Sequence, residues 1–72
     1  MPSSSFQKII ENYFNQISEK LPCNMEDLFE ELESQEEIYE KFIIILHLLQ
    51  NGKIMYQKQT NFIYTPEGGK DE

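Results

Sequence analysis

The chain has 72 residues and a formal net charge of −7, from 13 acidic residues against six lysines, with no arginine. A chain of this length forms one domain at most, and a single core of this size rarely leaves more than about 3–5 kcal/mol of net stability. One cysteine excludes an internal disulfide, and Cys23 with His47 supplies too few soft ligands for a zinc site, so no metal or other cofactor is expected. An acidic chain without arginine is also poorly suited to DNA phosphates.

The sequence contains no segment typical of a membrane or secreted protein. Its longest apolar run, residues 42–49, is too short to cross a bilayer and is interrupted by His47. Residues 1–5 are polar and lack the charged and apolar regions of a signal peptide. With one unpaired cysteine as well, we expect a cytoplasmic location.

The first predicted element is an amphipathic helix over residues 6–20. A serine at position 3, 4 or 5 is expected to cap it, so residues 1–5 are predicted to be a flexible N-terminus. Lys20 suits a helix C-terminus, and Pro22 disfavours helical geometry at Leu21. The apolar positions recur at the spacing of one helix face: Phe6, Ile9, Ile10, Tyr13, Phe14 and Ile17.

Two further helices are predicted from their capping residues. Asn24 is a typical N-cap for a short second helix, whose buried face is expected to hold Met25, Leu28, Phe29 and Leu32. Ser34 and Glu37 match the capping box, so a third helix is expected from about residue 35 to residue 49 or 50. Asn51 and Gly52 then favour a left-handed helix stop.

After Gly52 the apolar period changes from that of a helix to that of a strand. Even positions carry Ile54, Tyr56, Phe62 and Tyr64. We predict a β-hairpin with strands at about 53–57 and 61–65, packed on the helices through Tyr56, Phe62 and Tyr64. Residues 66–72 are expected to be a disordered tail. The predicted fold class is α+β: a small winged helix over residues 6–65, with three helices followed by a β-hairpin wing.

The apolar arc of the third helix is wider than one core-facing side requires. At about 100° per residue, the side facing the first two helices is expected to hold Ile38, Ile45, Leu48 and Leu49. Ile44 lies on one flank of this side, near Glu40. Two interpretations remain open: the fold buries the whole arc, or one flank stays exposed as a docking surface. The candidate docking residues follow at i, i+3, i+4 and i+7, and are Tyr39, Phe42, Ile43 and Leu46.

Acidic residues dominate the middle of the chain. From Glu26 to Glu40 there are eight acids and no base. They form either a solvated face with favourable charges at helix N-termini, or a patch for a basic partner. In both cases the third helix is unsuited to the major groove, where DNA-binding winged helices often place it. Lys53 and Lys58 make the hairpin mildly basic.

Two side chains are candidates for catalysis, and the spacing of the sequence suggests no serine, histidine and acid arrangement around them. His47 is expected at the boundary of the core. Cys23 precedes a helix start, where a thiolate would be stabilised, but we expect it to be a small apolar filler. The sequence has no glycine-rich phosphate loop and no spacing typical of paired catalytic carboxylates. We therefore predict that the chain is not an enzyme and binds no small-molecule substrate.

Residues 25–29 (MEDLF) are followed by an apolar helix at 42–49 (FIIILHLL). After this helix come Gly52, Ile54, Tyr56 and Phe62. This pattern, within residues 21 to 65, resembles the C-terminal domain of the kleisin family, in the branch of bacterial segregation and condensation protein A. The chain departs from the family pattern at three places: Lys58 for a glutamine, His47 for a glutamate, and residues 63–65 (IYT) for glycine-aspartate-isoleucine.

The resemblance implies a winged helix that docks onto the ATPase head of a structural-maintenance-of-chromosomes (SMC) protein, in a complex for chromosome condensation and segregation. Phe42 and Leu46 would face the SMC head, with the wing strands around Tyr56 and Phe62 beside it. The implied location is the cytoplasm and, through the partner, the nucleoid. A full kleisin also has an N-terminal domain and a long linker, so the chain is expected to be an excised domain or a short relative. Two alternatives remain: a DNA-binding winged-helix regulator, and a scaffold module of another complex.

Overall fold

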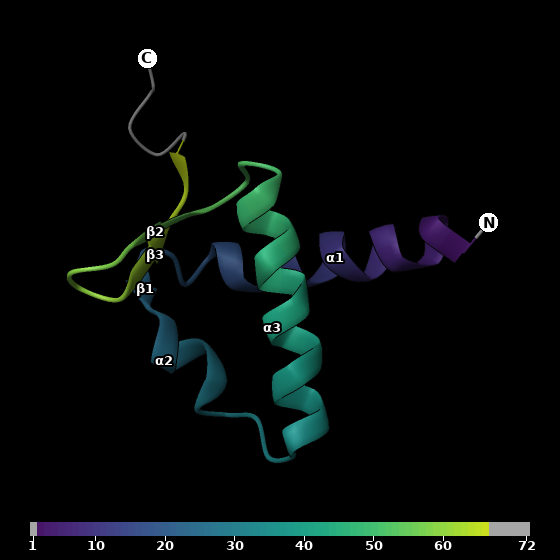
Figure 1. Cartoon of the computed structure of the whole chain (residues 1–72), viewed down its shortest axis with the longest axis horizontal. Helices are drawn as coiled ribbons and strands as arrows, with labels where there is room; N and C mark the ends of the chain where they lie inside the picture. Colours follow the sequence, from purple (N-terminus) through teal and green to yellow (C-terminus); the bar gives the residue numbers. More distant parts are fainter. Residues whose placement is uncertain (1, 67–72) are drawn as a thin grey trace.

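The computed structural model describes residues 2–66, which form three helices and a three-stranded antiparallel sheet (Figure 1). In chain order the elements are α1 (Pro2–Ser18), β1 (Cys23–Asn24), α2 (Met25–Phe29), α3 (Gln35–Gln50), β2 (Met55–Gln57) and β3 (Phe62–Tyr64). This is the predicted α+β class, a small winged-helix-like fold. Of the predicted tail, residues 67–72 lie outside the described residues, as does Met1.

Helix α1 begins at Pro2, so the segment predicted to be a flexible N-terminus is helical from its second residue. Proline is favoured in the first helical turn because its fixed φ suits a helix and its missing N–H has no helical partner there. The helix ends at Ser18, where the N–H groups of Lys20 and Leu21 donate to the Ile17 carbonyl at 2.8 and 3.1 Å. These two bonds close its last turn.

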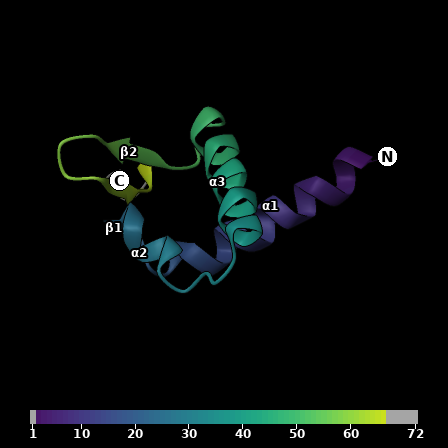
Figure 2. The same cartoon turned by 60° about the horizontal axis from the view of Figure 1, so that its bottom comes forward.

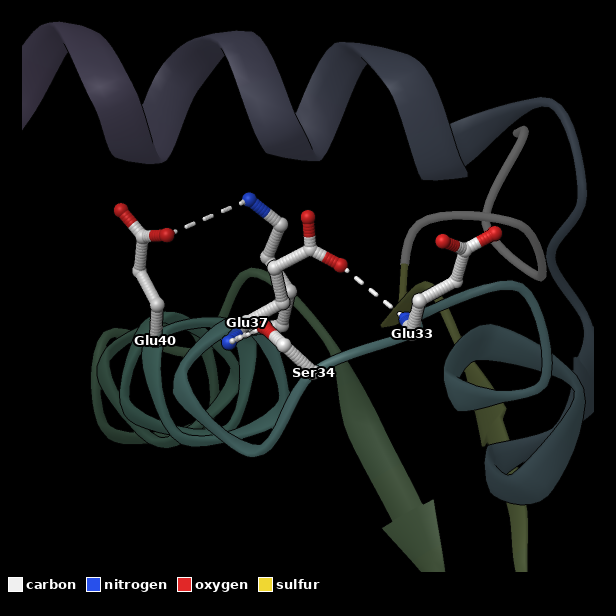
Figure 3. A network of polar contacts seen from close by, with 5 residues as sticks. Glu33, Ser34, Glu37 and Glu40 are labelled. Carbon is white, nitrogen blue, oxygen red and sulfur yellow. Dashed lines mark hydrogen bonds and ion pairs between the residues drawn. The ribbon is translucent and has the colours of Figure 1, made fainter.

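Polar caps fix the starts of α2 and α3, as predicted. The Asn24 side-chain oxygen accepts from the N–H of Glu26 at 2.9 Å. The Ser34 hydroxyl accepts from the N–H of Glu37 at 3.1 Å, and the Glu37 carboxylate accepts from the N–H of Glu33 at 3.1 Å (Figure 3). In a standard capping box the Glu37 carboxylate would accept from the N–H of Ser34, the N-cap residue; here it accepts from the N–H of Glu33, one residue earlier. The N–H groups of Glu33 and Glu37 are therefore both hydrogen-bonded.

The end of α3 is a left-handed stop at Gly52, also as predicted. Gly52 has φ of 74°, a conformation that glycine adopts without steric penalty. Its N–H donates to the Leu49 carbonyl at 3.1 Å, and the N–H of Lys53 donates to the Leu48 carbonyl at 2.9 Å. This pair of bonds is a Schellman motif, and it turns the chain from α3 into the hairpin.

The sheet contains one strand more than the predicted hairpin. Its strand order is β1-β3-β2, with β3 in the middle, and the hairpin lies to one side of α3 in both views (Figures 1 and 2). In β1, Cys23 pairs with Ile63 and Asn24 pairs with Phe62. A strand of two residues carries no periodic signal, so the sequence pattern missed it.

The hairpin packs on the helices through isoleucines and not through the predicted aromatic side chains. Ile54 and Ile63 are fully buried, whereas Tyr56, Phe62 and Tyr64 are exposed. Directly opposite residues share one face of a sheet, and Tyr56 pairs with Ile63. Phe62 and Tyr64 therefore point to the other face. The prediction placed the second strand one residue out of phase, which inverts every side chain.

The side of α3 that enters the core is also rotated from the predicted one. Ile45 and Leu48 are buried as expected, but Ile38 is exposed and Ile44 is completely buried. Lys41 lies on this side of α3, with its ammonium 5.5 Å from the centre of the Tyr13 ring on α1 and its side chain only 26% exposed. A charged residue therefore occupies part of the side that faces α1. The buried core comprises Ile10, Tyr13, Ile17, Leu28, Ile44, Ile45, Leu48, Ile54 and Ile63.

A pair of identical substitutions tests these burial assignments. Ile63→Val removes one methylene from a fully buried site and should lower the free energy of unfolding by roughly 0.5–1.5 kcal/mol. Ile43→Val makes the same change on an exposed face of α3 and should shift it by less than about 0.5 kcal/mol. Urea unfolding followed by circular dichroism measures both. Equal effects at the two positions would contradict the core described above.

Candidate docking surface

Four apolar side chains on α3 face solvent together and form what we call the α3 stripe: Tyr39, Phe42, Ile43 and Leu46. Their exposed fractions lie between 41% and 68%. They follow at i, i+3, i+4 and i+7, on the side of the helix away from Ile44, Ile45 and Leu48. Of the two interpretations left open by the sequence, the one in which the fold buries the whole arc is therefore wrong for this structure.

The charges that border the α3 stripe are acidic. At about 100° per residue, Glu36 lies beside Ile43, with Glu40 next to it. The one lysine of α3, Lys41, has a side chain only 26% exposed, and its ammonium lies 3.7 Å from the Glu40 carboxylate (Figure 3). Because Lys41 is also held over Tyr13, the free charges on the surface of α3 are negative.

The eight acids from Glu26 to Glu40 are all exposed, and four of them lie in the first turn of a helix. Such positions are favourable because the helix dipole places partial positive charge there. One of the remaining acids, Glu31, has a carboxylate 3.8 Å from the Lys20 ammonium. Exposure of these acids is compatible with both interpretations, a solvated face and a patch for a basic partner, and it keeps this end of the molecule strongly acidic.

The two hairpin residues predicted to bind a partner do not lie together. Tyr56 shares a face with Ile63, and its hydroxyl donates to the Asn61 side-chain oxygen at 2.6 Å. Phe62 lies on the opposite, outer face. Met55 and Tyr64, which were not predicted as partner-binding residues, lie beside Phe62 on this outer face of the hairpin. Only the register of the strands shows that these three side chains belong together.

A groove of about 500 Å³ is lined by residues from all three helices and has charges of both signs, from Lys20, Lys41, Glu31 and Glu37. Its floor includes Tyr13, Ile17 and Leu28. Burial, and to a smaller extent the nearby Cys23, raises the pKa of the Tyr13 hydroxyl. This hydroxyl therefore keeps its proton at neutral pH and is not placed to act as a base.

His47 and Cys23 occupy structural positions. The His47 ring packs edge-on against Phe6, with ring centres 5.1 Å apart, at the boundary of the core as expected. Cys23 is half-buried in β1 and packs against the core. Burial raises the pKa of its thiol, Asp27 raises it further, and Lys20 lowers it. The thiol pKa is raised on balance, and burial and Asp27 therefore disfavour the thiolate form of Cys23.

Over residues 2–66, no three histidine, cysteine or acidic side chains gather closely enough to hold a metal ion. None of the helices described is long and apolar enough to cross a membrane. Comparison with protein-family models, with curated proteins and with solved structures gave no match. The exposed α3 stripe and the outer face of the hairpin are thus the features from which function must be argued.

The Cys23 thiol gives a pH-dependent prediction. At neutral pH, iodoacetamide should alkylate Cys23 more slowly than it alkylates free cysteine, because less of the Cys23 thiol is ionised. The alkylation rate should increase with pH, but at higher pH values than for free cysteine. Asp27→Asn removes a negative neighbour, so the thiol pKa should fall and alkylation at neutral pH should speed up. Lys20→Gln should do the opposite. The control is Glu30→Gln, which removes an acid at the C-terminal end of α2, the helix that contains Asp27. It should leave the dependence of the alkylation rate on pH unchanged. A thiol that titrates below free cysteine would contradict this account.

Proposed function

We propose that the chain is a non-catalytic docking domain that binds another protein through the α3 stripe, in the manner of a kleisin C-terminal domain on an SMC ATPase head. The observation that carries this proposal is one helix face with four neighbouring large apolar side chains in solvent. Single exposed apolar residues are ordinary on protein surfaces, but contiguous patches bordered by polar residues mark interaction sites.

The stripe is sufficient to anchor a contact but not to make a whole interface. Full burial of one such side chain contributes about 1.5–3 kcal/mol, and each of these four is already roughly half-buried, so together they contribute on the order of 3–6 kcal/mol. Association costs a comparable amount in lost translation and rotation. The partner must therefore also contact residues around the stripe. This is the usual arrangement of a central apolar cluster with a polar rim.

The charges favour a protein with a basic rim over DNA. Glu36, Glu37 and Glu40 are exposed on the helix that a DNA-binding winged helix would insert, and Lys41 is engaged with Tyr13 and Glu40. Phosphates brought to this face would be repelled instead of releasing counterions. A groove with an apolar floor and lysine or arginine at its edge would match both the stripe and its acidic border.

The choice of an SMC head as that protein rests on the kleisin resemblance. Phe42 and Leu46, the positions that the resemblance assigns to the contact, both belong to the exposed α3 stripe. Tyr56 and Phe62 on the hairpin are exposed as well, and so are available to a partner that extends beyond α3. In this proposal the chain works in the cytoplasm and reaches the nucleoid through its SMC partner.

Charge substitutions in the stripe test the proposal. Phe42→Lys and Leu46→Lys should each abolish binding to the SMC ATPase head of the source organism, because a lysine would be buried at the centre of the contact. The far-ultraviolet circular dichroism and the melting temperature should stay close to those of the parent, since both side chains are solvent-exposed. Asn12→Lys, an exposed position on α1, adds the same charge away from the stripe and should bind normally. Isothermal titration calorimetry measures the affinity.

Capture from a lysate, followed by mass spectrometry, identifies the partner without assuming it. An SMC ATPase that is retained by the parent and by Asn12→Lys but lost with Phe42→Lys supports the proposal. Unfolding of both stripe variants would mean that these residues belong to the core, and would contradict the docking role. Binding to duplex DNA at low salt would favour the regulator in its place.

A further inference from the structure

Strand β2 leaves an open edge of the sheet. In the order β1-β3-β2, it pairs with β3 on one side, and no second partner occurs within residues 2–66. The opposite edge is covered, because β1 continues directly into α2. Natural edge strands are usually blunted by their shortness, by a charge, by a proline or by a bulge. Strand β2 is short, with the three residues Met55–Gln57, but it contains neither a charge nor a proline, so no residue within the strand blocks pairing along its outer edge.

Apolar side chains lie on both faces of this open edge. Met55, Phe62 and Tyr64 are exposed on the outer face of the hairpin, and Tyr56 is exposed on the other face. A strand added beside β2 would place its alternate side chains next to these residues. Backbone pairing would then be combined with side-chain contacts, which is how extended peptides bind to sheet edges.

The charged residues next to β2 in the sequence are both lysines, whereas the chain as a whole is acidic. Lys53 and Lys58 flank the strand, both are exposed, and neither forms an ion pair with another described residue. No acid occurs from residue 41 to residue 66; ten of the 13 acids precede residue 41 and three follow residue 66. The two lysines are therefore the charged residues nearest to β2 along the chain.

We propose that the edge of β2 binds an extended acidic peptide segment by strand addition. The segment has an alternating apolar core with one acid near each end, about five positions apart, to match Lys53 and Lys58. A second copy of the chain fits poorly, since antiparallel pairing of two β2 strands brings the lysines of both copies together. This site lies on the hairpin and not on the α3 stripe, and it is tested on the protein without the partner of that stripe.

Synthetic hexapeptides test the site directly. The first alternates valine and threonine between two terminal glutamates, and the second has lysines in place of the glutamates. Binding is followed by amide chemical-shift changes of the complete chain. The acidic peptide should saturate with its largest shifts at residues 53–58, and the basic peptide should bind at least tenfold more weakly. Equal binding of both peptides, or no saturable binding of the acidic one, would overturn the proposal.

Backbone methylation separates strand addition from simple charge attraction. In an antiparallel pair, only alternate residues of the added strand direct their N–H groups at the partner. N-methylation of one alternate set of the acidic peptide should therefore abolish binding, and methylation of the other set should leave most of it. If neither set matters, the peptide is held by charge alone and no strand is added.

Variants of the protein distinguish this site from the α3 stripe. Lys58→Glu should weaken the acidic peptide at least tenfold and reverse the preference toward the basic peptide. Phe42→Lys, which disables the stripe, should leave peptide binding unchanged. The opposite pattern, loss with Phe42→Lys and none with Lys58→Glu, would place the peptide on α3 and overturn the β2 site while leaving the docking role of the stripe intact.

Discussion

Helix α3 has two apolar faces, and the rest of this small domain is large enough to cover only one of them. The covered face supplies Ile44, Ile45 and Leu48, which meet α1 and the hairpin isoleucines Ile54 and Ile63 in a single core. Lys41 completes this side by lying along Tyr13. The other face has no element opposite it among the described residues, and its large side chains therefore stay in solvent. Most of what we infer about function follows from this mismatch between one helix and one core.

Charge divides the surface into two regions of different chemistry. Acids occupy the N-terminal halves of α2 and α3, whereas the only charged residues of the hairpin are lysines. An apolar stripe with an acidic border suits a basic groove, whereas an open strand edge with flanking lysines suits an acidic segment. One domain can thus orient a partner by two contacts of opposite sign, because a reversed partner would bring like charges together.

The helical half of the fold could be predicted from the sequence because its signals are local. Asn24, Ser34 and Gly52 fix helix ends through bonds to residues within a few positions, and the structure contains each of these ends. The exposure of the α3 stripe could also be predicted, because α3 has more large apolar residues than the core of so small a domain can bury.

The sheet could not be predicted as well because its signals are non-local. Strand β1 exists through pairing with β3, some 40 residues later, and Asn61 secures this region through bonds to Asn24 and Tyr56. Asn61 has a left-handed φ of 60°, which no periodic pattern records. The alternation of side chains along β3 could be recognised in the sequence. Which face of β3 packs on the helices, however, depends on its register with β2. The core side of α3 was misplaced for a similar reason, since a hydrophobicity pattern cannot anticipate that Lys41 lies along Tyr13.

Solvent accessibility of methyl groups in the free protein tests the two-faced helix most directly. A soluble gadolinium chelate enhances the relaxation of methyl protons that it can approach, and α3 offers two matched pairs, Ile43 with Ile45 and Leu46 with Leu48. We expect strong enhancement at Ile43 and Leu46 and little at Ile45 and Leu48, because the first two face solvent and the others are in the core. Similar protection of all four side chains in the monomer would show that the fold covers both faces, and the docking surface would not exist.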